Sequence, residues 1–583
     1  MTSDSSFLPL CRADAVARGW DAVDVVLVSG DAYVDHPSFG AAVIGRVLEA
    51  GGYRVAVVPQ PNWRDDLRDF KKMGIPRLFF GVTAGNMDSM VNHYTAARRL
   101  RSNDAYTPEG RAGMRPDYAV TVYTRILKQL YPHVPVVIGG IEASLRRLTH
   151  YDYWSDTLKP SVLVESGADY LVYGMGERPI TELAQKLREH MPLSEIRKTP
   201  QIAYIVNNPA ETDNSRQIMY LPSHASCKRS KKVFAEHFRI FEQQANISDP
   251  PILAEPLYDQ AGKIVIVNPP YPLMTTGMMD EIYDLPFSYQ AHPRYKGKRI
   301  PALDMIRFSV CLHRGCFGGC SFCTIAAHQG KKISSRSRES ILKEVTRLTA
   351  MDQFKGYLTD LGGPTANMYK MQGRNRKVCD TCHRTSCLFP AVCKNLDTSH
   401  RQLLELYEAV RNVPGVKKAT IGSGIRYDLF LNEKGFLNDE GKQFFSDLLR
   451  YHVSGRLKVA PEHTQDNVLR FMHKPSFELY HVLSEAFRRE NIAQALKLQL
   501  VPYFISSHPG CTQRDMSLLA ARFKKDRIRV EQVQDFTPTP MTKSSVMYYT
   551  GLVPETGKRV FVERNPQKKA LQKEGFFKNN RKS

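Results

Sequence analysis

Residues 314–330 read RGCFGGCSFCTIAAHQG and place three cysteines, Cys316, Cys320 and Cys323, within eight residues. Three glycines stand among these cysteines, and the apolar run MIRFSV at 305–310 comes shortly before the stretch. Glycine lets a backbone turn tightly and approach a bulky group closely, because it has no Cβ. The pattern therefore predicts a strand followed by a wrapped loop that presents three thiolates to one ligand.

Three thiolates restrict the kind of centre that this loop can hold. A tetrahedral structural zinc would need a fourth ligand, whereas a 4Fe-4S cluster bound by three cysteines leaves one iron open for another molecule. Seven of the eleven cysteines lie between Cys316 and Cys393 in two short clusters. That distribution is typical of metal ligands and not of disulfides, so we expect reduced thiols.

From residue 306 onward, apolar runs alternate with amphipathic helical segments, and the alternation contains six apolar runs. Such repeats predict a partial parallel (β/α)6 barrel over 301–550, with its chemistry at the carboxyl ends of the strands. A Cys-rich insertion at 376–396 interrupts the repeats. The three-cysteine loop follows the first predicted strand of this barrel.

The remaining parts of the chain differ from one another in composition. Five apolar runs alternating with helical segments predict a doubly wound Rossmann-like domain at 1–195, so the fold class is α/β. Residues 196–300 lose helical periodicity and combine prolines with many apolar residues, which predicts an extended connector packed along both domains. Residues 551–583 are densely basic, and we predict that this tail is disordered.

Several segments together resemble one superfamily. The C-x-x-x-C-x-x-C spacing, with Phe322 before the last cysteine, occurs with DLGGPTANMY, GSGIRYD and LKVAPEHT. These segments resemble the radical S-adenosylmethionine (radical SAM) superfamily and, within it, the YgiQ-type proteins, over nearly the whole chain. The resemblance implies S-adenosylmethionine on the open iron of a 4Fe-4S cluster and one-electron cleavage to a 5'-deoxyadenosyl radical that abstracts hydrogen from substrate. It also implies a reducing protein such as flavodoxin or ferredoxin, while the substrate stays unknown.

The end of the second predicted barrel strand carries Gly362, Gly363 and Pro364. In the superfamily, a Gly-Gly-Glu segment at this place uses backbone carbonyls to hold the methionyl amine. The two glycines suit that close approach, although Pro364 replaces the usual glutamate. The alternative is a tight turn that enters a loop.

The ends of the third and fourth predicted strands carry further candidates for binding S-adenosylmethionine. The hydroxyl of Ser423 and the carboxylate of Asp428 suit ribose hydroxyls, and the planar guanidinium of Arg426 suits the methionyl carboxylate or a substrate anion. Glu462, beside His463, lies where barrel enzymes place catalytic groups. The alternatives are an Arg–Asp pair that fixes a loop and a structural hydrogen-bonding role for either residue of the Glu–His pair.

A second cysteine group consists of Cys379, Cys382, Cys387 and Cys393. Four thiolates close a coordination shell, which predicts a second metal centre. Their spacing is looser than that of a zinc ribbon, so zinc and an auxiliary iron–sulfur cluster both stay open.

The amino-terminal domain invites a comparison with cobalamin-binding members of the superfamily. Their signature is D-x-H-x-x-G, whereas this chain has Asp35 directly followed by His36 and then Gly40. Because the histidine is displaced, we predict a cofactor-free structural or substrate domain and not a cobalamin site.

The charge of the chain bears on its partners and its class. With 81 Lys and Arg against 59 Asp and Glu, the net charge is +22, which favours a polyanion such as RNA or leaves only a solvated basic surface. An RNA-modifying, methylthiotransferase-like radical enzyme is one alternative, but only Cys11 and Cys227 precede the barrel. A non-enzymatic, zinc-dependent nucleic-acid-binding protein is the other. The first residues lack a signal-peptide pattern and no long apolar run occurs, so we expect a soluble, cytoplasmic protein without membrane contact.

Overall fold

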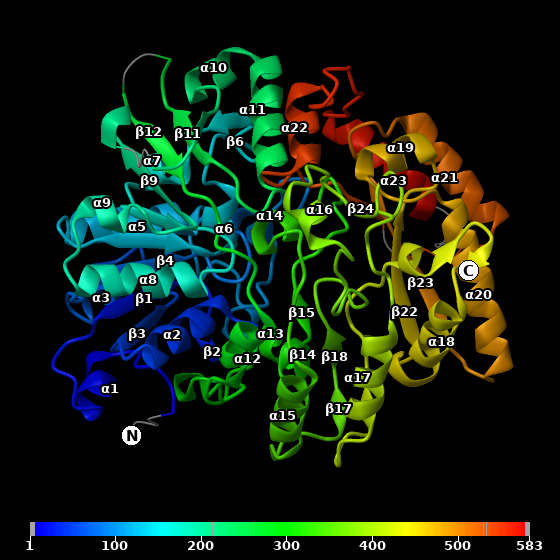
Figure 1. The fold of residues 1–583 in the computed structure, drawn as a ribbon, viewed down its shortest axis with the longest axis horizontal. Coiled ribbons are helices and arrows are strands. Elements are labelled where there is room, and N and C mark those ends of the chain that lie inside the picture. Colours follow the sequence, from blue (N-terminus) through cyan, green and yellow to red (C-terminus); the bar gives the residue numbers. More distant parts are fainter. Residues whose placement is uncertain (1–5, 212–214, 260–261, 529, 532, 578–583) are drawn as a thin grey trace.

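The computed structural model describes residues 6–211, 215–259, 262–528, 530–531 and 533–577. In Figure 1 the amino-terminal part, blue to green, forms an α/β unit on the left, and the green to orange part forms a second unit on the right. Helix α22 (Lys543–Thr550) lies at the top, between the two. No helix of the described residues combines the length and apolar character that a membrane span requires.

The centre of the amino-terminal sheet consists of five parallel strands in the order β3, β1, β4, β5, β8. These are β1 (Val25–Ser29), β3 (Val55–Pro59), β4 (Phe79–Thr83), β5 (Val136–Gly139) and β8 (Tyr170–Val172). Nearly all of their residues are buried, as expected for strands that are covered on both faces. The predicted doubly wound fold is confirmed.

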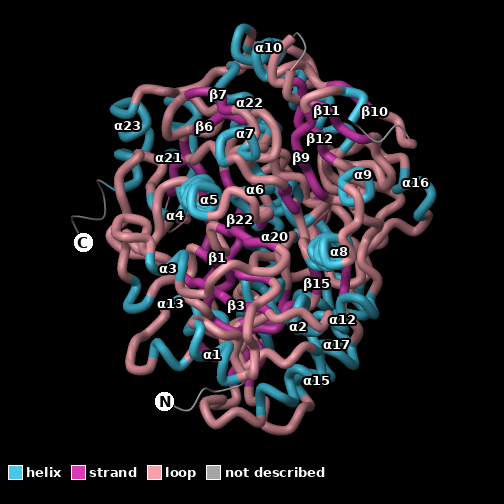
Figure 2. Tube along the Cα trace, turned by 90° about the vertical axis from the view of Figure 1, so that its left-hand side faces the viewer, coloured by secondary structure: helices cyan, strands magenta, loops and turns pink. Residues whose placement is uncertain are grey.

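Alternate side chains of these strands point to opposite layers of helices. Val25 and Leu27 pack with α2 (Gly40–Ala50) and α8 (Glu177–Arg188). Their neighbours Val26 and Val28 pack with two other helices, α5 (Ala119–Leu130) and α7 (Val162–Ser166). Figure 2 shows α5 and α8 on opposite sides of the strands. The apolar cluster on the α2 and α8 side continues into the core of the second unit, so the two units share one core.

The connector predicted at 196–300 is wrong in part, because this segment completes the amino-terminal sheet. It contributes β9 (Ile202–Val206), β10 (Ile218–Tyr220), β11 (Ile252–Pro256) and β12 (Ile264–Val267), which extend the sheet to nine strands. Strand β9 runs antiparallel to β8, and β12 runs antiparallel to both β9 and β11. The segment also forms helices α10 (His224–Arg229) and α11 (Lys231–Gln244). Its short apolar runs are buried by pairing with strands that lie far away in the sequence.

The second unit contains all six barrel strands that the sequence predicts, and the second of them, GYLTDLGG, forms two short strands. Strands β14 (Ser309–Cys311) and β18 (Asp360–Gly362) pair in parallel, as do β17 (Tyr357–Leu358) and β19 (Lys418–Ala419). A further parallel set contains β22 (Arg456–Glu462), β23 (Gln499–Ser506) and β24 (Val533–Asp535). The intervening helices are α15 (Arg338–Thr349), α17 (Arg401–Arg411), α18 (Asp439–Asp447), α20 (Glu478–Ala493) and α21 (Gln513–Lys525).

The disordered tail predicted at 551–583 is wrong for the part that the structure describes, while residues 578–583 lie outside the described residues. Helix α23 (Pro566–Phe577) packs on α21. Gln572 is buried, and its Oε1 accepts hydrogen bonds from the backbone N and the Oγ of Ser507, both at 3.0 Å. Lys573 pairs with Asp535 at the end of β24. Long basic side chains bury their stems here while their charged ends bond to the barrel, which composition alone does not reveal.

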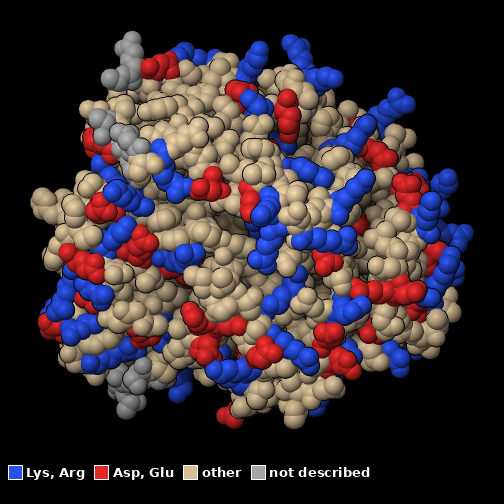
Figure 3. All heavy atoms as spheres, in the orientation of Figure 1, with Lys and Arg blue, Asp and Glu red and all other residues tan. Residues whose placement is uncertain are grey.

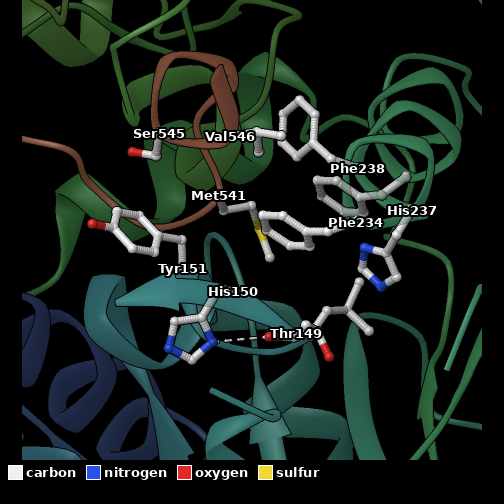
Figure 4. A pocket seen from close by; sticks show the side chains of 11 residues that line it. Thr149, His150, Tyr151, Phe234, His237, Phe238, Met541, Ser545 and Val546 are labelled. Atoms are coloured by element: carbon white, nitrogen blue, oxygen red, sulfur yellow. Dashed lines mark hydrogen bonds between the residues drawn. The ribbon is translucent and has the colours of Figure 1, made fainter. Parts of the chain in front are cut away.

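The carboxyl-terminal segment also seals against the amino-terminal unit. In Figure 4, Phe234 and Phe238 of α11 face Met541 and Val546 across a small cavity. The cavity has a volume of about 10 Å³, which is room for about one water molecule. This contact is therefore a packed interface and not a substrate pocket.

Candidate active site

The three cysteines of the sequence motif lie on a loop between β15 (His313–Arg314) and α14 (Ile325–Gln329). Gly315 and Gly319 have φ values of +88° and +61°, a region that side chains rarely adopt. A Cβ at Gly319 would lie 2.5 Å from the carbonyl oxygen of Thr385. The glycines therefore allow a tight turn and a close contact with another segment.

The thiols of this loop are surrounded by hydrogen-bond donors. Arg426 Nη1 donates to Cys320 Sγ at 3.4 Å, and Thr365 Oγ1 lies 3.5 Å from Cys316 Sγ. A Cβ at Gly318 would lie 3.3 Å from Cys316 Sγ, so the backbone runs close to the sulfur. Donors and backbone around sulfur are the environment that an iron–sulfur cluster requires.

Burial disfavours the thiolate form of Cys316 and Cys323 unless a cation is bound. It raises the pKa of Cys316 and raises that of Cys323 to about 12, and the charges of the neighbouring thiols add to both shifts. A bound metal centre would displace the protons. In the part of the chain that the structure describes, no three His, Cys, Asp or Glu side chains stand close enough to hold a single metal ion. Three thiolates can bind three irons of a 4Fe-4S cluster and leave the fourth iron open, so the cysteines of this loop suit such a cluster.

The segment after β18 lies against the three-cysteine loop. The carbonyl of Gly362 accepts a hydrogen bond from Leu312 N at 2.7 Å, and a Cβ at Gly363 would lie 2.6 Å from His313 Nε2. His313 Nε2 in turn donates to the carbonyl of Thr365 at 2.9 Å. Burial lowers the pKa of His313 to about 4, so its imidazole is neutral. The structure thus brings the Gly-Gly-Pro segment beside the loop, and the contact of Gly362, Gly363 and Pro364 with S-adenosylmethionine stays a prediction.

The segment after β19 reaches the same loop through an arginine. Arg426 forms a bidentate pair with Asp428, with distances of 2.9 Å from Nε to Oδ1 and 2.5 Å from Nη2 to Oδ2, while its Nη1 donates to Cys320. Ser423 Oγ donates to Asp360 Oδ2 at 2.7 Å. The arginine–aspartate pair is the alternative that the sequence left open. Ribose and carboxylate contacts of these residues stay predictions.

Two polar residues at this site were missed by the sequence analysis. Asp360 also accepts from Gly422 N at 2.9 Å, which links the second and third strand ends. Asn367 bonds to both backbone groups of Arg426, at 2.8 Å and 3.0 Å. Both residues belong to the segment DLGGPTANMY, so their place in the motif was the available signal.

Glu462 completes the site from the end of β22. It is buried, has an unusual φ of 70°, and lies with its Oε1 3.6 Å from Lys474 Nζ. Burial raises the pKa of Glu462, and the charge of Glu462 acts on the pKa of Cys323. Positive φ at a residue with a side chain often marks a functional position. The adjacent His463 is neutral, because burial lowers its pKa to about 4, and its Nε2 lies 3.6 Å from Cys511 Sγ.

The second cysteine group lies directly beside the first. Cys387 N donates to the carbonyl of Phe317 at 3.0 Å, and Ser386 Oγ donates to the carbonyl of Gly318 at 2.7 Å. Burial raises the pKa of Cys387, and the charges of the other three thiols of the group raise it further, so all four lie near one another. The sequence predicted this group as a centre, but it did not predict its contact with the three-cysteine loop.

The histidine singled out in the amino-terminal unit is enclosed by protein. His36 is fully buried, its ring packs at 5.0 Å from that of Tyr289, and its Nδ1 accepts from Ser38 N at 3.0 Å. Burial lowers its pKa to about 3. The neighbouring Asp35 is held by Arg46 at 2.6 Å. Both side chains serve the packing of this unit.

Comparisons with known proteins identify the family to which the chain belongs. A family model described as Radical SAM N-terminal matches residues 7–309, and one described as Domain of unknown function (DUF3362) matches residues 531–579. UPF0313 proteins of Bacteroides thetaiotaomicron and Porphyromonas gingivalis are 53% and 54% identical, over 98% of this chain and 94% and 90% of theirs. A UPF0313 protein of Methanocella arvoryzae is 46% identical over 96% of this chain and 91% of its own.

Two solved structures resemble the chain at low identity. One is the radical S-adenosylmethionine methyltransferase TsrM from Kitasatospora setae with cobalamin and a 4Fe-4S cluster bound. It matches with a TM-score of 0.49 and 15% identity, over 89% of this chain and 77% of that chain. The other is the cobalamin-dependent S-adenosylmethionine radical enzyme OxsB, with a TM-score of 0.47 and 10% identity over 87% and 53%. Because its relatives match along nearly its whole length and its amino-terminal half matches the radical SAM model, the chain belongs to the UPF0313, or YgiQ-type, family of radical SAM enzymes.

Proposed function

We propose that this enzyme cleaves S-adenosylmethionine reductively at a 4Fe-4S cluster held by Cys316, Cys320 and Cys323. When bound, the cluster supplies the electron that splits the sulfonium C–S bond into methionine and a 5'-deoxyadenosyl radical, which abstracts hydrogen from a substrate. The supporting observation is that three strand ends converge on the three-cysteine loop, through Thr365, Arg426 and Glu462.

In this proposal the residues around the loop bind and orient S-adenosylmethionine. Backbone carbonyls near Gly362 and Gly363 receive the methionyl amine, and Arg426 faces the methionyl carboxylate while its fork stays on Asp428. The side-chain oxygens of Ser423 and Asp428 form hydrogen bonds with ribose hydroxyls. Glu462, buried and only 3.6 Å from Lys474, accepts a hydrogen bond from the same molecule. Charged groups in such a buried setting interact more strongly than in water.

A direct test replaces each of the three cysteines singly with alanine. Each thiolate binds one iron and none is spare, so we expect each variant to lose reductive cleavage of S-adenosylmethionine in anaerobic assays with dithionite. The matched control is Cys311→Ala, because Cys311 lies just before the loop and its thiol bonds to the carbonyl of His313 at 3.2 Å. Full cleavage with normal iron content in any of the three variants would remove that residue from the cluster. Measurements of iron, sulfide and absorbance on the wild type also test the alternative hypothesis of a non-enzymatic zinc protein.

We also infer that the amino-terminal unit works without cobalamin. Two observations support this inference. His36 is enclosed against Tyr289. The Arg115 side chain fills the ends of β1 and β4, where it bonds to Ala84 O at 2.7 Å and to Asp104 at 2.9 Å. Incubation with hydroxocobalamin followed by gel filtration should leave no bound corrinoid. Stoichiometric retention of the corrinoid contradicts this inference.

The chemistry requires an electron donor and a reducing compartment. All eleven cysteines are free thiols, which fits the cytoplasm, and a flavodoxin or ferredoxin is the expected donor. An RNA partner, as in a methylthiotransferase-like enzyme, is supported only by the net charge of +22. Filter binding with RNA at several salt concentrations tests it, and a slope near zero contradicts it.

A further inference from the structure

The insertion that carries the second cysteine group is too small to fold by apolar burial alone. A backbone bridge between Gly373 and Leu396 closes its base, and Arg374 N donates to Asn395 O at 2.7 Å. Within 373–396 only three residues are buried, and the one regular element is helix α16 (Arg376–Asp380). Short segments with so little core are usually held by metals or disulfides, and the four thiols are free.

The four thiols come together from two turns of this insertion. Cys382 N lies 3.4 Å from the carbonyl of Cys379, and Cys393 N lies 2.7 Å from the carbonyl of Cys387. Asn395 Nδ2 donates to Cys379 Sγ at 3.3 Å, a hydrogen bond of the kind that tunes metal-bound thiolates.

The place of the thiols favours an iron–sulfur cluster over zinc. Four cysteines suit either centre, but zinc has no redox chemistry, whereas an iron–sulfur cluster accepts and donates single electrons. The group lies directly beside the three-cysteine loop, where Cys387 N donates to the carbonyl of Phe317 at 3.0 Å. A centre at this place can therefore exchange electrons with the first one.

The two cysteine groups are joined by a short apolar path. Cys316, Cys387 and Cys393 all pack against one small cluster, which consists of Phe317, Met368, Met371, Leu388, Leu396 and Leu429. The hydrogen bond from Cys387 N to the carbonyl of Phe317, the residue after Cys316, also links the insertion to the three-cysteine loop. An electron held at the insertion is thus separated from the three-cysteine loop by little more than one side chain.

The surface around the insertion is cationic. Within the insertion, five basic side chains are exposed against a single acid, Asp380; they are Arg374, Arg376, Lys377, Arg384 and Lys394. Figure 3 shows Lys and Arg side chains gathered near the centre of the face on which α16 lies in Figure 1. Such a field attracts acidic proteins and accelerates their encounter.

From these observations we propose that Cys379, Cys382, Cys387 and Cys393 bind a second iron–sulfur cluster, which takes electrons from an acidic one-electron carrier protein docked on the cationic surface. The carrier is oxidised by one electron as the second cluster is reduced, and the second cluster is reoxidised when it passes that electron to the first. No bond is formed and no proton is moved. The role as a relay rests on the proposed function, whereas the metal site does not.

The metal site is tested in the full chain without its first cluster. The variant Cys316→Ala/Cys320→Ala/Cys323→Ala, purified anaerobically, should keep iron and sulfide and show an electron paramagnetic resonance signal after reduction. Adding Cys382→Ala and Cys393→Ala should remove both. Zinc in place of iron, or no metal in the triple variant, overturns the proposal. Neither result depends on cleavage of S-adenosylmethionine.

The docking surface is tested by charge reversal on α16. We expect Arg376→Glu/Lys377→Glu to slow cleavage driven by reduced flavodoxin roughly tenfold at low salt, and to leave dithionite-driven cleavage unchanged. The matched control is Lys524→Glu/Lys525→Glu, two exposed lysines at the end of α21. An unchanged flavodoxin-driven rate in the α16 variant overturns the docking proposal. A variant that keeps this rate but loses binding to RNA also overturns it, because the surface would then bind RNA and not a carrier protein. Absence of dithionite-driven cleavage in the wild type would instead contradict the proposed function.

Discussion

At the scale of single residues, one glycine sets how closely the second barrel strand approaches the three-cysteine loop. Gly363 lies against the ring of His313, and the loop beyond it reaches Cys316 through Thr365. Gly424, at the next strand end, has no atom within 4 Å of the place where a Cβ would stand. The two glycines therefore offer a matched comparison of close packing and open space.

We expect Gly363→Ala to destabilise the protein by about 1–3 kcal/mol, because a new Cβ would overlap the buried imidazole and push the segment away. Affinity for S-adenosylmethionine should fall as well. Gly424→Ala should change neither quantity. Thermal unfolding and isothermal titration measure the two effects, and equal behaviour of the two variants would show that the contact with His313 is unimportant.

At the scale of elements, helix α23 connects the end of the chain to the barrel. Gln572 bonds to Ser507 after β23, Lys573 pairs with Asp535 at the end of β24, and Lys569 Nζ donates to the hydroxyl of Tyr548 on α22 at 2.9 Å. The helix therefore covers the carboxyl ends of the last two strands. Removing it exposes buried polar groups of the barrel.

We expect a chain that ends at Gly557 to unfold at a lower temperature than the full chain, by roughly 2–4 °C for each kcal/mol that the helix contributes. The control Lys573→Ala removes only the partly exposed pair with Asp535 and should cost less than the loss of the whole helix. Calorimetry of the three proteins measures the difference. Equal melting temperatures for the truncated and full chains would mean that α23 is dispensable for stability.

The docking of α23 should depend on pH through one lysine. Burial lowers the pKa of Lys569 from 10.5 to about 8 in the folded protein. Between these values the unfolded chain binds more protons, so stability rises with pH, whereas below about 8 the cost of burying the charge applies in full. The melting temperature of the wild type, measured relative to that of Lys569→Met, should therefore increase from pH 8 to 10. A constant difference contradicts this prediction.

At the scale of the whole molecule, one buried ion pair joins the two units beside the active site. Arg314, next to the three-cysteine loop, pairs with Glu177 at the start of α8, and their side chains are only 9% and 6% exposed. Gly174 also approaches α14, since a Cβ there would lie 3.1 Å from the carbonyl of His328. The amino-terminal sheet thus supports the loop that follows the first barrel strand.

We expect Glu177→Ala to cost about 3–5 kcal/mol, because it leaves the Arg314 charge buried without a partner. Since the pair spans both units, calorimetry should show the single transition split into two. The control Asp88→Ala breaks the equally buried pair with Arg146 inside the amino-terminal unit and should lower stability without splitting the transition. If both variants unfold in one transition, the shared apolar core alone couples the units.

The features that depend on local pattern could be predicted from the chain itself. The five amino-terminal strands, the six barrel strands and both cysteine groups lie where periodicity and spacing placed them, because burial of alternating or continuous apolar runs is a local requirement. The strand ends were correctly expected to gather at the three-cysteine loop, since parallel strands present their carboxyl ends on one side. Arg426 and Glu462 both lie there.

Features that depend on partners distant in the chain needed the folded structure. Strands β9 to β12 joined the amino-terminal sheet, α23 docked on the barrel, and Ser386 and Cys387 met Gly318 and Phe317 across about 70 residues of sequence. Such contacts are selected by the shape and polarity of surfaces that exist only after the chain has collapsed, and a short window of sequence carries no record of them. The composition of the basic tail and the prolines of residues 196–300 therefore pointed away from the packing that these segments adopt.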